Sequence, residues 1–209
     1  MMKLASEGYP YIIFFAIVTV IAFFIAGIWL ALLPFVLTIF MLFFFRDPER
    51  KIPEGKGIFL SPADGKIILI QDIREDKFLK DNTTEVSIFM SPFNVHVNRA
   101  PCDGVVESVV HTAGRFLSAF RHEASLQNEN IAMLLNTNER KVLVRQVAGF
   151  LARRAVCRVK AGDKLKRGER YGIIKFSSRL DIYLPREADI KVKSGEKVKA
   201  GETVIGVIK

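Results

Sequence analysis

The chain has 209 residues; half are hydrophobic, a quarter are charged, and the formal net charge at pH 7 is +9. The only charges before Arg46 are Lys3 and Glu7, which cancel, so the whole excess lies on the later residues. This excess favours an anionic partner, and an apolar stretch on the same chain favours a lipid surface over nucleic acid. The only two cysteines, Cys102 and Cys157, lack the spacing of a metal site, and a disulfide framework is not expected. Free cysteines are typical of a reducing cytosolic setting.

Residues 11–45 form an apolar stretch without a single charge. As one helix this stretch would be about 52 Å long, whereas the hydrocarbon core of a membrane is about 30 Å thick. Gly27 and Pro34 lie near its middle and are places where a helix can break. We therefore expect two short helices, at about 12–26 and 29–45, forming a hairpin that returns to the side it entered. One long tilted span is the alternative.

Basic residues follow the apolar stretch at once, at Arg46, Arg50 and Lys51. Positive charge next to a membrane segment favours the cytoplasmic side. The predicted localisation is therefore the cell membrane, with the following domain in the cytoplasm. The expected organisation is an N-terminal tail (1–10), a membrane hairpin (11–45), a linker (46–56) and a cytosolic β domain (57–209).

From residue 57 onward, short runs with alternating apolar residues lie between turn residues, which predicts a mainly β domain. Ten strands are expected, at 57–60, 66–73, 85–90, 95–98, 105–110, 131–135, 141–147, 155–159, 171–176 and 181–184. The polar segment 120–130 is expected to be a loop or short helix able to cover a site.

Two pairs of internal repeats run through this domain. Residues 159–169 (VKAGDKLKRGE) recur as 192–202 (VKSGEKVKAGE), offset by 33, and residues 62–67 (PADGKI) recur more weakly as 101–106 (PCDGVV), offset by 39. Such repeats predict duplicated units that pack face to face. They resemble the barrel-sandwich modules of lipoyl and biotinyl domains. The expected fold is thus a barrel-sandwich-hybrid-like duplicated β domain behind an N-terminal transmembrane or membrane-inserted α-hairpin.

Residues 173–185, between the copies of the stronger repeat, form a β-rich run that is interrupted by Ser177 and Ser178. A carrier domain would show a lysine at this place, so the serine pair argues against a carrier. A serine hydroxyl can attack the carbonyl just before its own nitrogen if a base takes its proton and donors stabilise the oxyanion. A serine pair in a strand is also compatible with a purely structural role.

His96 lies in the segment 91–101 (SPFNVHVNRAP). An alternating strand would place Asn94, His96 and Asn98 on one face, opposite Phe93. Three polar side chains on one face indicate either the wall of a site or a solvent-facing edge strand.

Asp64 lies in the segment 61–65 (SPADG), which has the composition of a tight turn. The weaker repeat has the same Asp-Gly pair at Asp103. The chain contains no nucleophile elbow, phosphate-binding glycine loop or zinc-ligand spacing. Arg145 and Gln146 are groups that could meet a phosphate or simply solvate a surface, whereas His111 is expected at the surface.

Five motifs occur along the chain in one order: FRDPER (45–50), SPADG (61–65), SPFNVHVNRAP (91–101), VRQVAG (144–149) and KFSSR (175–179). Together with the apolar hairpin, this order resembles the short, archaeal-type phosphatidylserine decarboxylases. These are pyruvoyl-dependent lyases that are made as zymogens and process themselves. The resemblance covers nearly the whole chain.

The resemblance implies that Ser178 attacks the carbonyl of Ser177 and forms an ester. β-Elimination would then release a β chain (1–177), and hydrolysis with loss of ammonia would leave a pyruvoyl group on an α chain (178–209). The family's Asp–His pair corresponds to Asp64 and His96, with His96 as the acid and base and Asp64 orienting its ring.

The resemblance also implies the reaction and its partners. The pyruvoyl group would form a Schiff base with the amine of phosphatidylserine and withdraw electrons as CO₂ leaves, giving phosphatidylethanolamine without metal or pyridoxal phosphate. The partners would be this lipid and an anionic membrane surface, with no nucleic acid, and a homodimer is compatible with the family. Candidate substrate contacts are Asn94, Asn98, Phe93 and Phe176.

The chain departs from the family at Ser177, where a glycine normally precedes the processing serine. A glycine suits a strained turn, so Ser177 could slow cleavage or mark a form that stays intact. The site is also similar to that of bacterial histidine decarboxylases, which cut a Ser-Ser bond. Two alternatives stay open: a membrane-anchored lipid hydrolase using Ser178, His96 and Asp64, and a non-catalytic barrel-sandwich adaptor.

Overall fold

The computed structural model describes residues 3–114, 128–137, 140–149, 155–176 and 178–208. The chain divides into two compact units, residues 1–49 and residues 50–209. Residues 120–127 of the expected polar cover lie outside the described residues.

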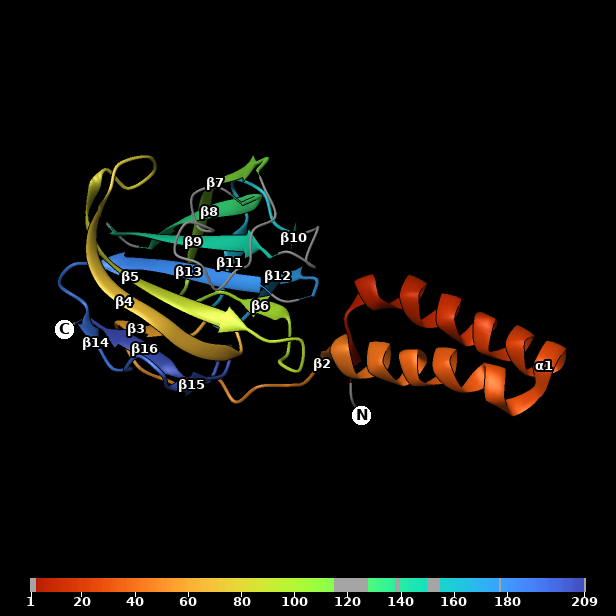
Figure 1. The fold of residues 1–209 in the computed structure, drawn as a ribbon. Coiled ribbons are helices and arrows are strands. Elements are labelled where there is room, and N and C mark those ends of the chain that lie inside the picture. The colour runs from red at the N-terminus through yellow and green to blue at the C-terminus, as the bar shows by residue number, and fades with distance from the viewer. Residues whose placement is uncertain (1–2, 115–127, 138–139, 150–154, 177, 209) are drawn as a thin grey trace. The chain divides into compact units, whose positions relative to one another are not determined.

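The first unit is a long apolar helix that doubles back on itself (Figure 1). Its elements are β1 (Lys3–Leu4), η1 (Ser6–Gly8), α1 (Tyr9–Phe44) and β2 (Arg46–Asp47). Helical geometry is interrupted inside α1 at Ala26 and at Gly27, whose φ of 74° is a conformation that glycine adopts readily. The two ends of the unit meet, because the Ala5 N–H donates to the Phe45 carbonyl at 2.8 Å.

The break in α1 occurs at Gly27 and not at Pro34, which lies inside the second helical arm. A proline removes one backbone hydrogen bond from a helix, whereas a positive φ reverses the path of the chain. By length and composition, the segment Ser6–Phe44 is apolar enough to cross a membrane.

The second unit is mainly β, which confirms the predicted fold class. Its largest sheet has eight strands in the order β11-β7-β8-β9-β13-β5-β4-β15 and is curled (Figure 1). Its strands are β4 (Gly65–Glu75), β5 (Asp81–Met90), β7 (Gly104–Thr112), β8 (Asn130–Thr137), β9 (Arg140–Ala148), β11 (Lys164–Leu165), β13 (Ser178–Pro185) and β15 (Lys197–Val198).

Two three-stranded sheets complete the second unit, in the orders β10-β12-β6 and β14-β16-β3. Their strands are β3 (Ile58–Leu60), β6 (Val97–Arg99), β10 (Ala155–Cys157), β12 (Arg170–Ile174), β14 (Asp189–Ile190) and β16 (Val204–Val207). Each of the ten expected strands overlaps an observed one. The strand expected at 95–98 begins only at Val97, because residues 92–94 form a turn in which the Asn94 N–H donates to the Ser91 carbonyl at 2.9 Å.

The internal repeats form matched backbone hydrogen bonds. Four backbone hydrogen bonds form two equivalent pairs. In the first pair, the Gly162 N–H donates to the Val106 carbonyl and the Gly195 N–H to the Ile67 carbonyl, each at 2.8 Å. In the second pair, the Gly168 N–H donates to the Ala100 carbonyl at 2.8 Å and the Gly201 N–H to the Ser61 carbonyl at 2.9 Å. Within each pair the donors lie 33 residues apart and the acceptors lie 39 residues apart, the same offsets as in the sequence. Each copy of the stronger repeat therefore binds one copy of the weaker repeat, and the domain has two equivalent halves.

One face of the eight-stranded sheet packs on the main hydrophobic core. Alternate residues of the central strands supply this face, and none exposes as much as 1% of its surface: Val86, Ile88 and Met90 of β5, Val142 and Val144 of β9, and Leu180, Ile182 and Leu184 of β13. Because side chains alternate along a strand, the residues between them point to the opposite face.

The opposite face of the same strands carries a buried network of charged groups. Arg179 exposes 1% of its surface and donates to Asp181 at 2.6 Å, to Glu85 at 3.3 Å and to Ser87 at 2.7 Å. Burial opposes the charge of Arg179, but the carboxylates of Asp181 and Glu85 outweigh this effect, and the pKa of the guanidinium is raised.

A second arginine extends this network. Arg145, a candidate for meeting a phosphate, is 8% exposed and donates to the Tyr183 hydroxyl at 2.9 Å and to Glu75 at 3.4 Å. Tyr183 in turn donates to Glu85 at 3.2 Å. The guanidinium of Arg145 is thus committed to neighbouring side chains.

Candidate active site

Ser178 is the first residue of β13, at the centre of the eight-stranded sheet. Its Cα partners are Met90 of β5 and Ala148 of β9, and its side chain is fully buried. The hydroxyl lies 3.4 Å from the Met90 sulfur, which is its only hydrogen-bond partner among the described residues. Because a thioether is a weak acceptor, the fold makes little use of this hydroxyl.

The chain enters β13 through a strained residue. Phe176 has a φ of 58°, a left-handed conformation that is rare for residues other than glycine. Such a residue costs about 1–3 kcal/mol and persists only when its surroundings hold it in place. Strain is therefore present two residues before Ser178. Ser177, the expected carbonyl partner in cleavage, lies outside the described residues.

His96 is fully buried and lies just before β6, not within it. Its Nδ1 is 3.0 Å from the Asn94 carbonyl, which favours the tautomer with the proton on Nδ1 and the lone pair on Nε2. Its own carbonyl accepts the Ile174 N–H at 3.3 Å. Because Ile174 ends β12, this bond ties the histidine loop to the strand that leads toward Ser178.

Asn98 and Gln146 lie beside the serine on the inner face of the sheet. The Met90 sulfur that Ser178 contacts also accepts the Asn98 amide at 3.9 Å, and Gln146 donates to Asn98 Oδ1 at 2.8 Å. Gln146 lies opposite Leu180 on β13, so it is a diagonal neighbour of Ser178 across the two strands. The structure thus brings Ser178 together with Asn98, one of the predicted substrate contacts.

Gln146, in the VRQVAG motif, was predicted only as a group that could meet a phosphate or solvate a surface, and not as a neighbour of Ser178. It is 1% exposed, and its Oε1 has no hydrogen-bond partner in the part of the chain that the structure describes. A Cβ at Gly172 would lie 2.9 Å from the Gln146 nitrogen, so the glycine leaves room for this amide. Strand alternation, which places residue 146 on the core side with Val144 and Ala148, was the signal that could have identified it.

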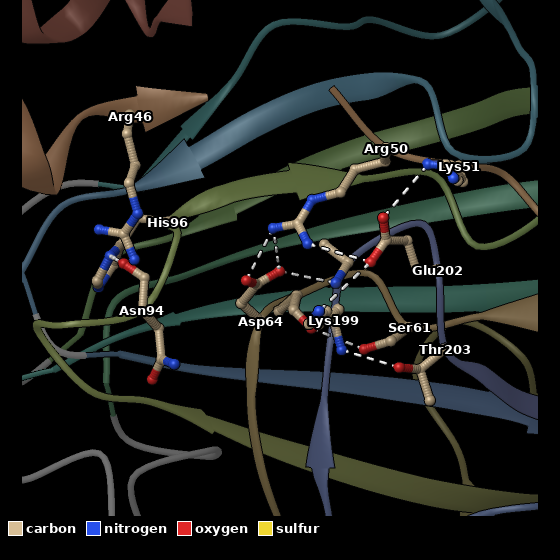
Figure 2. A network of polar contacts seen from close by, with 12 residues as sticks. Arg46, Arg50, Lys51, Ser61, Asp64, Asn94, His96, Lys199, Glu202 and Thr203 are labelled. Carbon is tan, nitrogen blue, oxygen red and sulfur yellow. Dashed lines mark hydrogen bonds and ion pairs between the residues drawn. The ribbon is translucent and has the colours of Figure 1, made fainter. Parts of the chain in front are cut away.

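Asp64 is held by an arginine and by a backbone amide (Figure 2). Arg50 donates to both of its carboxylate oxygens at 2.9 and 2.8 Å, and the Ala200 N–H donates to Oδ1 at 2.8 Å. Arg50 also reaches Glu202 at 3.4 Å. Neither residue was predicted at this site: Arg50 lies 14 residues before Asp64 outside the SPADG motif, and Glu202 lies 152 residues after Arg50.

In the part of the chain that the structure describes, the Asp64 carboxylate bonds to Arg50 and Ala200 and not to His96. Among the described residues no hydrogen bond links the two side chains, and the dashed lines of Figure 2 join Asp64 to Arg50 and not to His96. The SPADG segment bends at residues 62–64, and the Asp64 Oδ1 accepts an N–H from the distant Ala200 rather than from within the bend. The orienting role of Asp64 therefore remains a prediction.

Asn94 and Phe93 do not lie on a strand face with His96. The Asn94 Oδ1 accepts both the backbone N–H and the hydroxyl of Ser91, each at 2.9 Å, so its side chain closes the turn. Phe93, at the tip of this turn, exposes 69% of its surface. The expected strand alternation was wrong here because the local turn precedes β6.

The two cysteines are free, and burial raises the pKa of the Cys102 thiol to about 12 and also raises that of Cys157. His111 is largely exposed and lies 3.1 Å from Glu129, as expected for a surface residue. Within the described ranges, no three His, Cys, Asp or Glu side chains gather as a metal site.

Comparison with known proteins identifies the family of the chain. Residues 37–206 match the family model described as phosphatidylserine decarboxylase. The chain is 48% identical over 184 residues to the phosphatidylserine decarboxylase proenzyme of Syntrophus aciditrophicus, covering 87% of this chain and 86% of that one. It is 45% identical over 206 residues to the proenzyme of the same name from Syntrophotalea carbinolica, covering 98% and 96%.

These matches place the chain among the decarboxylases, and the prediction that it is an enzyme is confirmed. It belongs to the phosphatidylserine decarboxylase family, the family expected from the order of the five motifs.

Proposed function

We propose that the chain converts phosphatidylserine to phosphatidylethanolamine with a pyruvoyl group made from its own Ser178. One observation carries the proposal. In a member of this family, a fully buried serine has only a thioether as hydrogen-bond partner among the described residues and closely follows the strained Phe176.

The pyruvoyl group would form by cleavage of the Ser177–Ser178 bond. The Ser178 oxygen attacks the Ser177 carbonyl carbon; as the new C–O bond forms, the C–N bond breaks and the nitrogen takes a proton, giving an ester. Removal of the Ser178 Cα proton then expels the Ser177 carboxylate and leaves dehydroalanine. Water replaces the nitrogen, which leaves as ammonia, and a ketone remains at residue 178.

We assign the proton transfers to His96. Its Nδ1 lies at the Asn94 carbonyl, so Nε2 has the lone pair that a general base needs. The same imidazole can hold a proton for delivery to the substrate Cα after CO₂ has left. Asp64 would support the charged imidazole, although its oxygens bond to Arg50 and Ala200 in this structure.

The residues around position 178 fit a small neutral carbonyl group. The Met90 sulfur is apolar and polarisable, and Asn98 supplies an amide donor that is used only weakly, on that sulfur. When present, the pyruvoyl group supplies a carbonyl that withdraws the electron pair left by CO₂. Gln146 Oε1, buried and without a partner among the described residues, can accept an N–H of the substrate headgroup.

The lipid reaches this site from a membrane in our proposal. The helical arms of α1 would insert into the bilayer, with the β domain on the cytoplasmic side and its positive charge favouring anionic lipid. Phe93, at the exposed tip of its turn, and Phe176 are our candidates for contact with the apolar part of the lipid.

Intact-mass analysis of the purified full chain tests the proposal. We expect a fragment of residues 178–209 that lacks a free amino group and that reacts with hydroxylamine, as a ketone does. A single uncut chain without a carbonyl would contradict self-processing. An uncut chain that a fluorophosphonate labels at Ser178 would instead support the lipid hydrolase.

The two halves of the domain provide a matched pair for testing Asp64. The Asp103 Oδ1 accepts the Arg167 N–H at 2.9 Å, just as Asp64 accepts the Ala200 N–H. Asparagine keeps this acceptor, and Arg50 retains Glu202 at 3.4 Å when residue 64 loses its charge, so both Asp64→Asn and Asp103→Asn should fold. We expect Asp64→Asn to slow cleavage about 100-fold, a typical loss for acid–base catalysis, and Asp103→Asn to cleave at the normal rate.

Cleavage half-times from gel densitometry, with circular dichroism to verify folding, measure this difference. Equal rates in the two variants would limit Asp64 to the structural role that its hydrogen bonds already give it.

A further inference from the structure

A polar pocket of about 470 Å³ lies in the second half of the duplicated domain, away from Ser178 and His96. Its volume is within the range of small-molecule sites. The lining comes from β3 and the loop before it, the turn before β7, the end of β8 and start of β9, the stronger repeat and the residue after β16: Gly55, Lys56, Gly57, Ile58, Phe59, Cys102, Asp103, Thr137, Arg140, Arg167 and Ile208.

This pocket is the counterpart of the Asp64 site in the other half. The 39-residue offset relates Asp103 to Asp64, and the 33-residue offset relates Arg167 to Ala200. In the first half Arg50 covers the aspartate, and Asp64 is 9% exposed. In the second half Asp103 is exposed and lines the open pocket. Equivalent turns thus have different surroundings.

Comparison of the two halves indicates that the fold does not require the side chain of Arg167. The turn requires only a backbone N–H at this position, because Ala200 performs the same task with a methyl group. The guanidinium of Arg167 donates once, to the Gly55 carbonyl at 2.7 Å. Its Nε is buried and has no hydrogen-bond partner among the described residues.

The charge of the pocket is positive. Three of the described lining residues are basic (Lys56, Arg140 and Arg167), and one, Asp103, is acidic. Asp103 already accepts the Arg167 N–H, and Arg140 pairs with Glu187 at 3.2 Å. Lys56 and the remaining N–H groups of Arg167 are thus the groups best placed to bind an anion.

We propose that this pocket binds a phosphate group. A guanidinium presents a planar fork of N–H donors that matches phosphate oxygens, and a lysine adds a mobile positive charge. The phosphate could belong to a free phosphorylated molecule or to an anionic lipid headgroup, which present the same oxygens.

Thermal unfolding of the full chain in detergent tests the pocket with inorganic phosphate as the probe. At ten times its dissociation constant, phosphate should raise Tm by about 3–6 °C over potassium chloride of equal ionic strength. Arg167→Ala should remove this shift, and Ala200 indicates that the turn tolerates the substitution. Lys166→Ala makes the same charge change on an exposed neighbour outside the lining and should keep the shift.

Nanodiscs distinguish the two sources of the phosphate group. If a lipid headgroup fills the pocket, the shift should persist in phosphatidylcholine discs and vanish in discs containing phosphatidylglycerol. If a soluble molecule is the ligand, the shift should persist in both. The proposal is overturned if phosphate and chloride act alike on the wild type, or if Arg167→Ala and Lys56→Gln both keep the full shift.

Discussion

Ser178→Ala should leave a single 23.6 kDa chain that never yields the 178–209 fragment and has no decarboxylase activity. The methyl group cannot attack the preceding carbonyl, so neither the chain break nor the ketone can form. The fold should be preserved, because the lost hydroxyl hydrogen-bonds only to the Met90 sulfur among the described residues. Intact mass, together with CO₂ release from phosphatidylserine in mixed micelles, measures both effects.

The neighbouring Ser177→Ala variant is the matched control. It removes the same hydroxyl one residue earlier and should still be cut between residues 177 and 178. If Ser177→Ala stays intact while Ser178→Ala is cut, the roles of the two serines are reversed and our assignment of the pyruvoyl group is wrong.

Arg179→Met should produce the largest loss of stability of any single substitution proposed here. Methionine fills much of the volume but leaves the buried carboxylates of Glu85 and Asp181 without their cation. Breaking a buried ion pair from one side costs about 3–5 kcal/mol. For a chain of this size, such a loss corresponds to a fall in Tm of roughly 6–20 °C. Circular dichroism of the full chain in detergent follows this change.

Arg186→Met is the control variant, because it removes an arginine just after the end of the same strand, β13. Arg186 pairs with Asp72, but both side chains are more than half exposed, and surface pairs of this kind contribute about 0–1 kcal/mol. A small change in Tm for both arginine variants would mean that the Arg179 network adds little to the stability of the β domain.

Local patterns in the sequence predicted most of the fold. The ten expected strands are found because alternating apolar residues specify strands without knowledge of their partners. The very short strands β11, β14 and β15 were missed, because two residues are too few to show the alternation of apolar and polar residues that indicates a strand. β11 and β15 form where the two repeats bring their partners, Gly104 and Gly65, alongside. β14 pairs instead with β16, a four-residue strand that was also missed.

The candidate site was predicted less completely, since its contacts join distant parts of the chain. Motif order identified Ser178 and His96, but not that Arg50 would bind Asp64. Strand alternation places Arg179 on the face opposite the hydrophobic core, and this face is buried and charged. No local pattern distinguishes such a face from a solvent-facing one.

The position of Ser178 in the sheet determines what a chain break there would do. β13 begins at this residue and is hydrogen-bonded on both sides, to β5 and to β9, while β15 and β16 pair with β4 and β3. A cut before β13 would therefore free no peptide. The severed segment would stay interwoven with the larger one, and the pair would come apart only on denaturation.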